Sequence, residues 1–204
     1  MELNDDLSKL AASLESSADI ATNAGDFLRA EALWGRALAI RDRLDDRTCR
    51  VRVLRSLAGM YRSWGRWHRA LDAVFEVEME FRREPRDPAG LAGALADIGT
   101  TMLGASRPDS AADYLRQAVT AYQQLAEPAP ADQAHALVWW GQALWTQGAW
   151  VAARRRFSAA LALLVDVDDT LADDVRSLLR QPNGQPLPAA PRSCRDRDVE
   201  RHAP

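Results

Sequence analysis

The stretch that decides the fold is LRSLAGMYRSWGRWHRALDAV, residues 54–74. It contains two runs in which apolar residues recur at steps of three and four, a spacing that places them on one face of a helix. Gly65 lies between the runs and can take the left-handed backbone conformation that ends a helix. The stretch therefore predicts two antiparallel helices joined by a turn at Gly65.

The same arrangement of small residues occurs four times along the chain. Each copy has a small residue, a turn residue seven positions later, and two more small residues five and twelve positions after the turn. The copies are Ala18, Gly25, Ala30, Ala37; Ala58, Gly65, Ala70, Val77; Gly99, Ser106, Ala111, Ala118; and Gly141, Gly148, Ala153, Ala160. The turn residues lie 40, 41 and 42 positions apart, and self-similarity at such a period is typical of helical repeat arrays.

This pattern resembles the tetratricopeptide repeat. In that family a large residue precedes the first small one by four positions, and an aromatic residue follows the turn by two. The large residue here is Leu14, Leu54, Leu95 or Leu137, and the aromatic residue is Phe27, Trp67 or Trp150, with Pro108 in its place in the third copy. The resemblance implies an all-α fold, a right-handed superhelical array of four antiparallel helix pairs.

The spacing also indicates which kind of tetratricopeptide repeat this is. From the large leucine to the last small residue the distance is 23 positions in every copy. All residues beyond the usual period of about 34 therefore lie between the hairpins. In this respect the chain resembles the long-repeat proteins of the kinesin-light-chain type and the bacterial peptide-sensing regulators.

The expected domain organisation follows from these repeats. The array is predicted over residues 1–165, with repeats at about 7–44, 47–84, 88–126 and 131–165. An amphipathic helix over residues 166–181, with Asp169 or Thr170 as its N-cap, is expected to cover the last repeat, and a partner-binding helix is the alternative. Residues 182–204 are rich in proline and poor in apolar residues, so a disordered tail is predicted.

The composition limits the classes of function that we expect. The 204 residues are 47% hydrophobic and 27% charged, which is typical of a globular domain. We expect a bacterial protein. We expect it in the cytoplasm, because no apolar stretch reaches the roughly 18 residues of a membrane span and the N-terminus lacks the features of a secretion signal. The two cysteines and three histidines have no metal-ligand spacing, and no glycine-rich phosphate loop is present. No cofactor, no metal and no enzymatic activity are therefore expected.

Candidate binding residues come from the resemblance, which implies that the first helix of each pair lines a concave groove. The matching positions that we select as peptide contacts are Arg52, Arg55, Arg62, Gln142 and Trp145, with Trp139 at the groove edge and Trp140 in the core. Arginine binds carboxylates through two parallel hydrogen bonds, and tryptophan supplies buried area. The alternative for each arginine is a solvated side chain or a pair with Asp42, Asp45 or Asp46.

We therefore expect a non-catalytic protein–protein interaction scaffold that binds a peptide segment of a partner in the groove. The alternative is a regulatory sensor whose superhelix responds to a small ligand or signalling peptide and controls a transcriptional or signalling partner. Residues 41–70 hold nine arginines and three aspartates, but nucleic-acid binding is disfavoured because the net charge is −3 and no nucleic-acid motif is present. A salt-sensitive self-association between this basic belt and the acidic residues 166–174 is a further hypothesis.

Overall fold

Helices make up most of the described part of the chain. The structure is a computed structural model that describes residues 2–83, 87–164 and 168–187. Within these residues there are nine helices and no strand: α1 (Glu2–Asn23), α2 (Phe27–Arg43), α3 (Arg47–Ser63), α4 (Trp67–Arg82), α5 (Pro88–Gly104), α6 (Pro108–Gln123), α7 (Pro130–Thr146), α8 (Trp150–Leu163) and α9 (Asp169–Arg180). The chain divides into two compact units, Met1–Glu80 and Phe81–Pro204, and each is described by itself.

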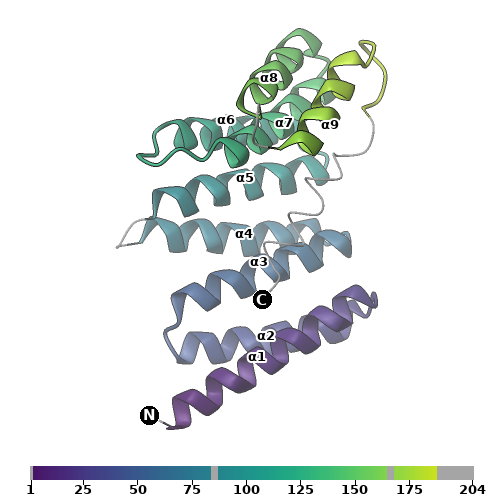
Figure 1. The fold of residues 1–204 in the computed structure, drawn as a ribbon. Helices are drawn as coiled ribbons and strands as arrows, with labels where there is room; N and C mark the ends of the chain where they lie inside the picture. The colour runs from purple at the N-terminus through teal and green to yellow at the C-terminus, as the bar shows by residue number, and fades with distance from the viewer. Residues whose placement is uncertain (1, 84–86, 165–167, 188–204) are drawn as a thin grey trace. The chain divides into compact units, whose positions relative to one another are not determined.

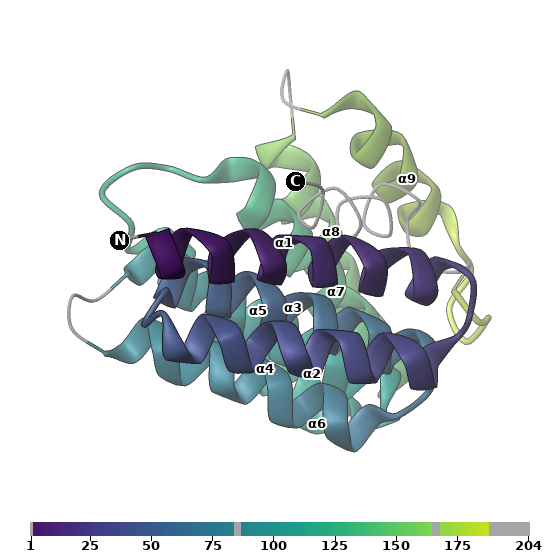
Figure 2. The same ribbon diagram turned by 90° about the horizontal axis from the view of Figure 1, so that it is seen from below.

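Short turns join the helices into antiparallel pairs (Figures 1 and 2). α1 packs against α2 in the first unit, and α5 against α6 and α7 against α8 in the second. The turns contain Gly25, Gly65 and Gly148, with φ of 75°, 74° and 79°. Ser106 has the same left-handed conformation, with φ of 59°, at the one turn that lacks glycine. The all-α fold class and the four predicted turn positions are therefore confirmed.

Small residues lie where the paired helices come closest. Gly141 of α7 faces the ring of Phe157 of α8, and a Cβ atom at Gly141 would lie 2.4 Å from that ring. Gly99 of α5 faces Leu115 of α6 in the same way, with a Cβ distance of 2.5 Å. Both large side chains are fully buried. The alternation of small and large residues therefore sets the approach of the helices in these two pairs.

Helix α9 adds a further layer to the core of the second unit. The residues of α9 that join the core cluster are Leu171, Ala172, Val175 and Leu178. The N-cap of the helix is Asp168, whose Oδ1 accepts a hydrogen bond from Leu171 N at 2.9 Å. The prediction of Asp169 or Thr170 as the cap is wrong, because Asp168 is the residue with the extended backbone from which a side chain can reach the first turn.

Substitution of Gly141 by alanine should destabilise the second unit, because the new methyl group must displace the buried ring of Phe157. Overpacking of this kind costs about 1–3 kcal/mol. Gly35 is the matched control, since it lies exposed in α2 and a Cβ there meets no atom within 4 Å. Gly35→Ala should raise the free energy of unfolding by about 0.5–1 kcal/mol. Urea unfolding measures both changes, and an unaffected Gly141→Ala protein would contradict the packing.

Candidate functional site

The first unit carries three of the predicted contact residues on one face of α3. Arg52, Arg55 and Arg62 follow one another at steps of three and seven, which places their side chains on one side of the helix. Arg52 is exposed, and Arg55 and Arg62 are half-buried. The basic character predicted for this face is therefore present on the surface of the first unit.

An acid of α1 holds one of these arginines. Arg52 Nη2 donates a hydrogen bond to Glu15 Oε2 at 2.8 Å, and Arg41 Nε of α2 donates to Glu15 Oε1, also at 2.8 Å. The side chain of Arg41 is 3% exposed and that of Glu15 is 11% exposed. Arg41 also donates to Ser8 Oγ at 3.1 Å and lies 3.5 Å from a carboxylate oxygen of Asp46. Glu15 is thus a buried carboxylate bound by arginines from two other helices.

Further arginines of residues 41–70 also pair within the first unit. Arg50 donates to Asp42, Glu76 and Glu80 at 2.7, 2.8 and 2.8 Å. Burial lowers the pKa of Arg50, but the hydrogen bond to Asp42 and the charges of Asp42, Glu80 and Glu76 outweigh it and raise the pKa. Arg69 pairs with Glu31. These pairs neutralise much of the basic belt and so weaken the electrostatic case for nucleic-acid binding or self-association through it.

The acidic stretch invoked for self-association is also partly engaged. Asp168 caps α9, and Asp173 accepts a hydrogen bond from Arg176 Nη1 at 2.5 Å. Asp166 lies outside the described residues. The self-association hypothesis therefore stays a prediction without a contact in the described residues to support it.

In the second unit Gln142 and Trp145 share one face of α7, but both are buried, with 8% and 5% of their surface exposed. The chain itself engages Trp145. Its Nε1 donates a hydrogen bond to Gln185 O at 2.8 Å, and the guanidinium carbon of Arg154 lies 5.5 Å from the centre of its ring. Their role as peptide contacts stays a prediction, and in this structure a later segment of the same chain contacts this face.

That segment, residues 182–187, packs on α7 and α8, whereas the sequence predicts disorder from residue 182 onward. It makes a turn in which Gln185 N donates to Pro182 O at 3.3 Å. Arg154 donates to Leu179 O, to Gln181 O and, at 3.2 Å, to Asn183 Oδ1. The composition of this segment gave no sign of the contacts, because the side chains that hold it, Arg154 and Trp145, lie elsewhere in the chain. The rest of the predicted tail, residues 188–204, lies outside the described residues.

The two adjacent tryptophans of α7 are both half-buried and both pack against the core of the second unit. Trp140, expected in the core, packs against it, and its ring also carries the guanidinium of Arg156 at 3.8 Å from the ring centre and lines a pocket. This pocket lies on the side of α7 away from Trp145, since five positions along a helix turn a side chain by about 140°. The groove-edge role of Trp139 stays a prediction.

Sequence reasoning missed the central role of Glu15 and the anchoring role of Arg154. For Glu15 the sequence does carry a signal, namely opposite charges at corresponding positions of successive repeats. Glu15 in the first repeat corresponds to Arg55 in the second, and Arg52 lies one helical turn before Arg55. No such signal existed for Arg154. Its partners are oxygens of the last turn of α9 and of the residues just after it, far from α8 in the sequence.

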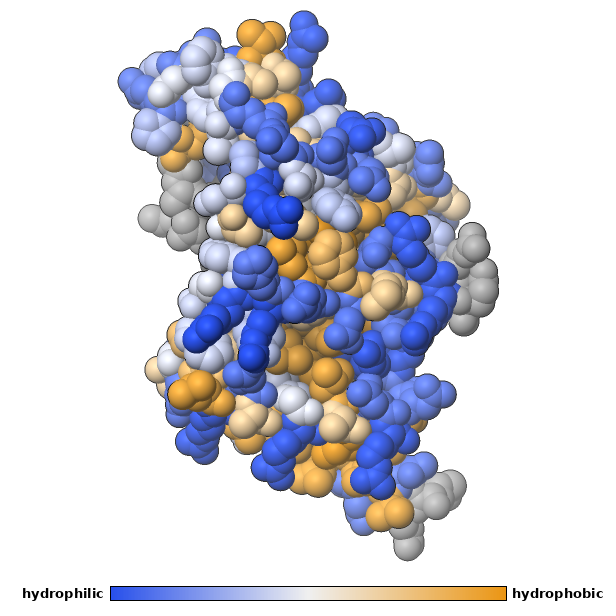
Figure 3. Space-filling view, turned by 180° about the vertical axis from the view of Figure 1, so that it is seen from behind, coloured by the Kyte–Doolittle hydropathy of each residue, from blue (hydrophilic) through white to orange (hydrophobic). Residues whose placement is uncertain are grey.

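The surface offers few other indications of chemistry. In the parts of the chain that the structure describes, no group of three or more His, Cys, Asp or Glu side chains could hold a metal ion. No helix there combines the length and the apolar character that crossing a membrane requires. Figure 3 shows hydrophobic side chains lying between hydrophilic ones on the face turned away from the view of Figure 1. On this face, hydropathy alone therefore does not mark a partner-binding surface.

Comparison with known proteins identifies the type of repeat. No protein-family model matches the sequence, and no curated protein matches it. Among solved structures, BtubC (BKLC) from P. vanneervenii has a TM-score of 0.69 at 17% identity, over 96% of this chain and 80% of that one. A provisionally assigned kinesin light chain from Podosopora anserina, with nearly identical TPR-like repeats, has a TM-score of 0.67 at 15% identity, over 96% and 94%. The chain therefore has a TPR-like helical-repeat fold.

Replacement of Glu15 by alanine should destabilise the first unit, because Arg41 would stay buried without its main acceptor. Removal of one partner of a buried pair costs about 3 kcal/mol or more. Asp42→Ala is the matched control, since Arg50 is less buried and keeps Glu76 and Glu80, and an exposed pair contributes less than about 1 kcal/mol. Equal losses in urea unfolding would show that Glu15 has no special role.

Proposed function

We propose that this chain is a protein-interaction scaffold that binds a peptide segment of a partner on the first helices of its repeats. The TPR-like fold is the first support, because such arrays present extended surfaces built from repeated helices. The second support is local and comes from the second unit, where residues 182–187 already occupy one such surface.

The contact that carries the proposal is the hydrogen bond from Trp145 Nε1 to Gln185 O. It joins Trp145, on the first helix of the fourth repeat, to the backbone of a non-helical segment. The bond does not depend on the side chains of that segment. Leu187, two residues further on, packs against the core of the unit. The surface thus combines a hydrogen-bond donor for a backbone carbonyl with an apolar area on which a side chain packs. The first feature orients a bound peptide and the second contributes affinity.

A second donor lies on the same face. Gln142 Nε2 is buried one turn before Trp145 and has no hydrogen-bond partner among the described residues. A buried donor without a partner costs about 1–3 kcal/mol. A peptide carbonyl placed against Gln142 would remove that cost, so the α7 face would hold a bound peptide at two points. In the first unit, Arg52, Arg55 and Arg62 are the proposed contacts for carboxylates of a partner, with Arg52 shared with Glu15.

The test releases the chain's own segment and then asks what the surface binds. Arg154→Gln removes the donors to Leu179 O, Gln181 O and Asn183 Oδ1. We expect this full-length variant to bind a synthetic peptide of residues 184–187, which keeps the Trp145 and core contacts and contains none of the partners of Arg154. In a fluorescence-anisotropy titration it should bind better than the unsubstituted chain, whose own segment competes. Adding Trp145→Phe should weaken binding about two- to tenfold, the value of one hydrogen bond.

Arg155→Gln is the control, because it makes the same charge change at an exposed position of α8. It should leave the competition by the chain's own segment intact. Partner proteins captured by the Arg154→Gln chain and lost with Trp145→Phe would identify the natural peptide. Failure of the peptide to bind Arg154→Gln, or equal capture by both variants, would refute the α7 face as the binding surface.

A further inference from the structure

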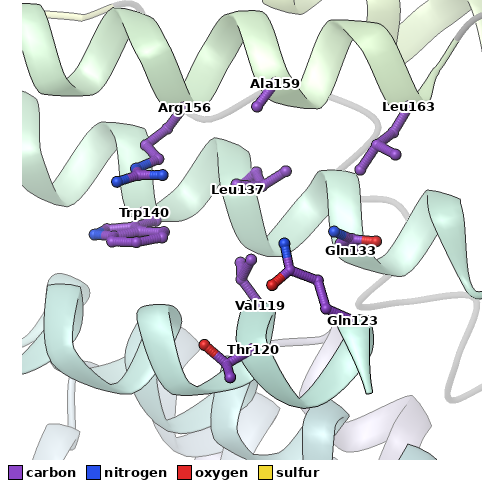
Figure 4. A pocket seen from close by; sticks show the side chains of 9 residues that line it. All are labelled: Val119, Thr120, Gln123, Gln133, Leu137, Trp140, Arg156, Ala159 and Leu163. Atoms are coloured by element: carbon purple, nitrogen blue, oxygen red, sulfur yellow. The ribbon is translucent and has the colours of Figure 1, made fainter. Parts of the chain in front are cut away.

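The second unit contains a pocket that the peptide surface does not use. It is formed by α6, α7 and α8 and has a volume of about 300 Å³. Figure 4 shows the side chains that line it: Val119, Thr120, Gln123, Gln133, Leu137, Trp140, Arg156, Ala159 and Leu163. Val119 and Leu137 are buried, whereas Thr120 and Gln123 are exposed. The pocket therefore has an apolar floor and a polar edge that is open to solvent.

One cation, the guanidinium of Arg156, lies in the pocket, and no acidic side chain lines the pocket to balance its charge. The guanidinium of Arg156 stacks on the ring of Trp140 at 3.8 Å from the ring centre (Figure 4). Its Nε is buried and has no hydrogen-bond partner among the described residues. None of the nine lining residues is acidic. Burial, and to a smaller degree the charge of Arg155, lower the pKa of Arg156, as expected of a cation that lacks an anion.

Arg154, two residues earlier on α8, is an arginine stacked on a tryptophan whose N–H groups also have oxygen acceptors. It also lies over a tryptophan, Trp145, but its donors are satisfied by Leu179 O, Gln181 O and Asn183 Oδ1. Arg156 has the same aromatic support, but no acceptor among the described residues reaches its Nε. A guanidinium stacked on a ring keeps its in-plane N–H groups free, and that edge matches the two oxygens of a carboxylate.

We propose that this pocket is a second binding site, which takes a carboxylate carried on a small apolar group. The carboxylate binds the N–H edge of Arg156, and the apolar group packs on Val119, Leu137 and Leu163. The amides of Gln123 and Gln133 lie at the edge of the pocket and bind a polar group beside the carboxylate (Figure 4). Two sources have this chemistry: the C-terminal residue of a peptide and a free carboxylic acid.

Three probes test the proposal on the full-length chain. They are N-acetyl-leucine, which resembles a peptide C-terminus, 4-methylpentanoate, a free acid with the same side group, and N-acetyl-leucinamide, which lacks the carboxylate. Binding is followed by NMR shifts of the Trp140 indole and Arg156 guanidinium N–H signals. We expect both acids to bind and the amide to bind at least about tenfold more weakly. Tighter binding of N-acetyl-leucine indicates the peptide source, and tighter binding of 4-methylpentanoate the free acid.

Matched variants locate the site. Arg156→Gln should weaken both acids by about tenfold or more, whereas Arg155→Gln, at an exposed position next to it, should leave binding unchanged within about twofold. Ala159→Met keeps Arg156 but fills the pocket, so it should also abolish binding, which gives a second reading if one variant folds poorly. No binding of either acid to the unsubstituted chain, equal binding of the amide, or unchanged binding in Arg156→Gln would each overturn the proposal.

Discussion

The close approach of paired helices is the constraint on which the rest of the structure depends. Gly141 and Gly99 show it most directly, because a single extra carbon at either would overlap a buried side chain of the partner helix. Two helices can come this close only where one of them lacks a side chain, and the large residue opposite then fills the space beside it. This requirement fixes the register of each hairpin and so determines which residues face the neighbouring helix and which face outward.

The outward positions are used differently in the two units. In the first unit, Arg52 of α3 lies at such a position and binds the buried Glu15 of α1, which Arg41 of α2 also binds. The positive charge of Arg52, which a partner would bind, is therefore already partly neutralised by Glu15. In the second unit, the corresponding face of α7 is apolar and polar but uncharged, and it is covered by residues 182–187. Under the proposed function, the first surface would bind anionic partners that compete with Glu15, and the second would bind a peptide through its backbone.

Much of the fold could be predicted from the sequence because its determinants are local and repeated. Gly65, Ala70 and Val77 lie within one hairpin, and the same steps recur in every copy, so spacing alone indicates helices, turns and packing positions. The candidate site depends on contacts between distant parts of the chain. Trp145 and Gln185 are 40 residues apart, and Arg41 and Glu15 are 26 apart. Periodicity within a repeat carries no information about such contacts, so the contact between Trp145 and Gln185 could not be predicted.

The three successive arginines of α8 show how position alone gives one side chain three different environments. Adjacent residues on a helix are turned by about 100°, so Arg154 and Arg156 point to opposite sides of α8 while Arg155 faces solvent. Arg154 and Arg156 both lie over tryptophans of α7, and both give up part of their hydration there. For Arg154, oxygens of the last turn of α9 and of the residues just after it replace the lost water. For Arg156 the described residues supply no acceptor at Nε, so the same chemistry leaves one side of α7 occupied by the chain and the other ready for an anion.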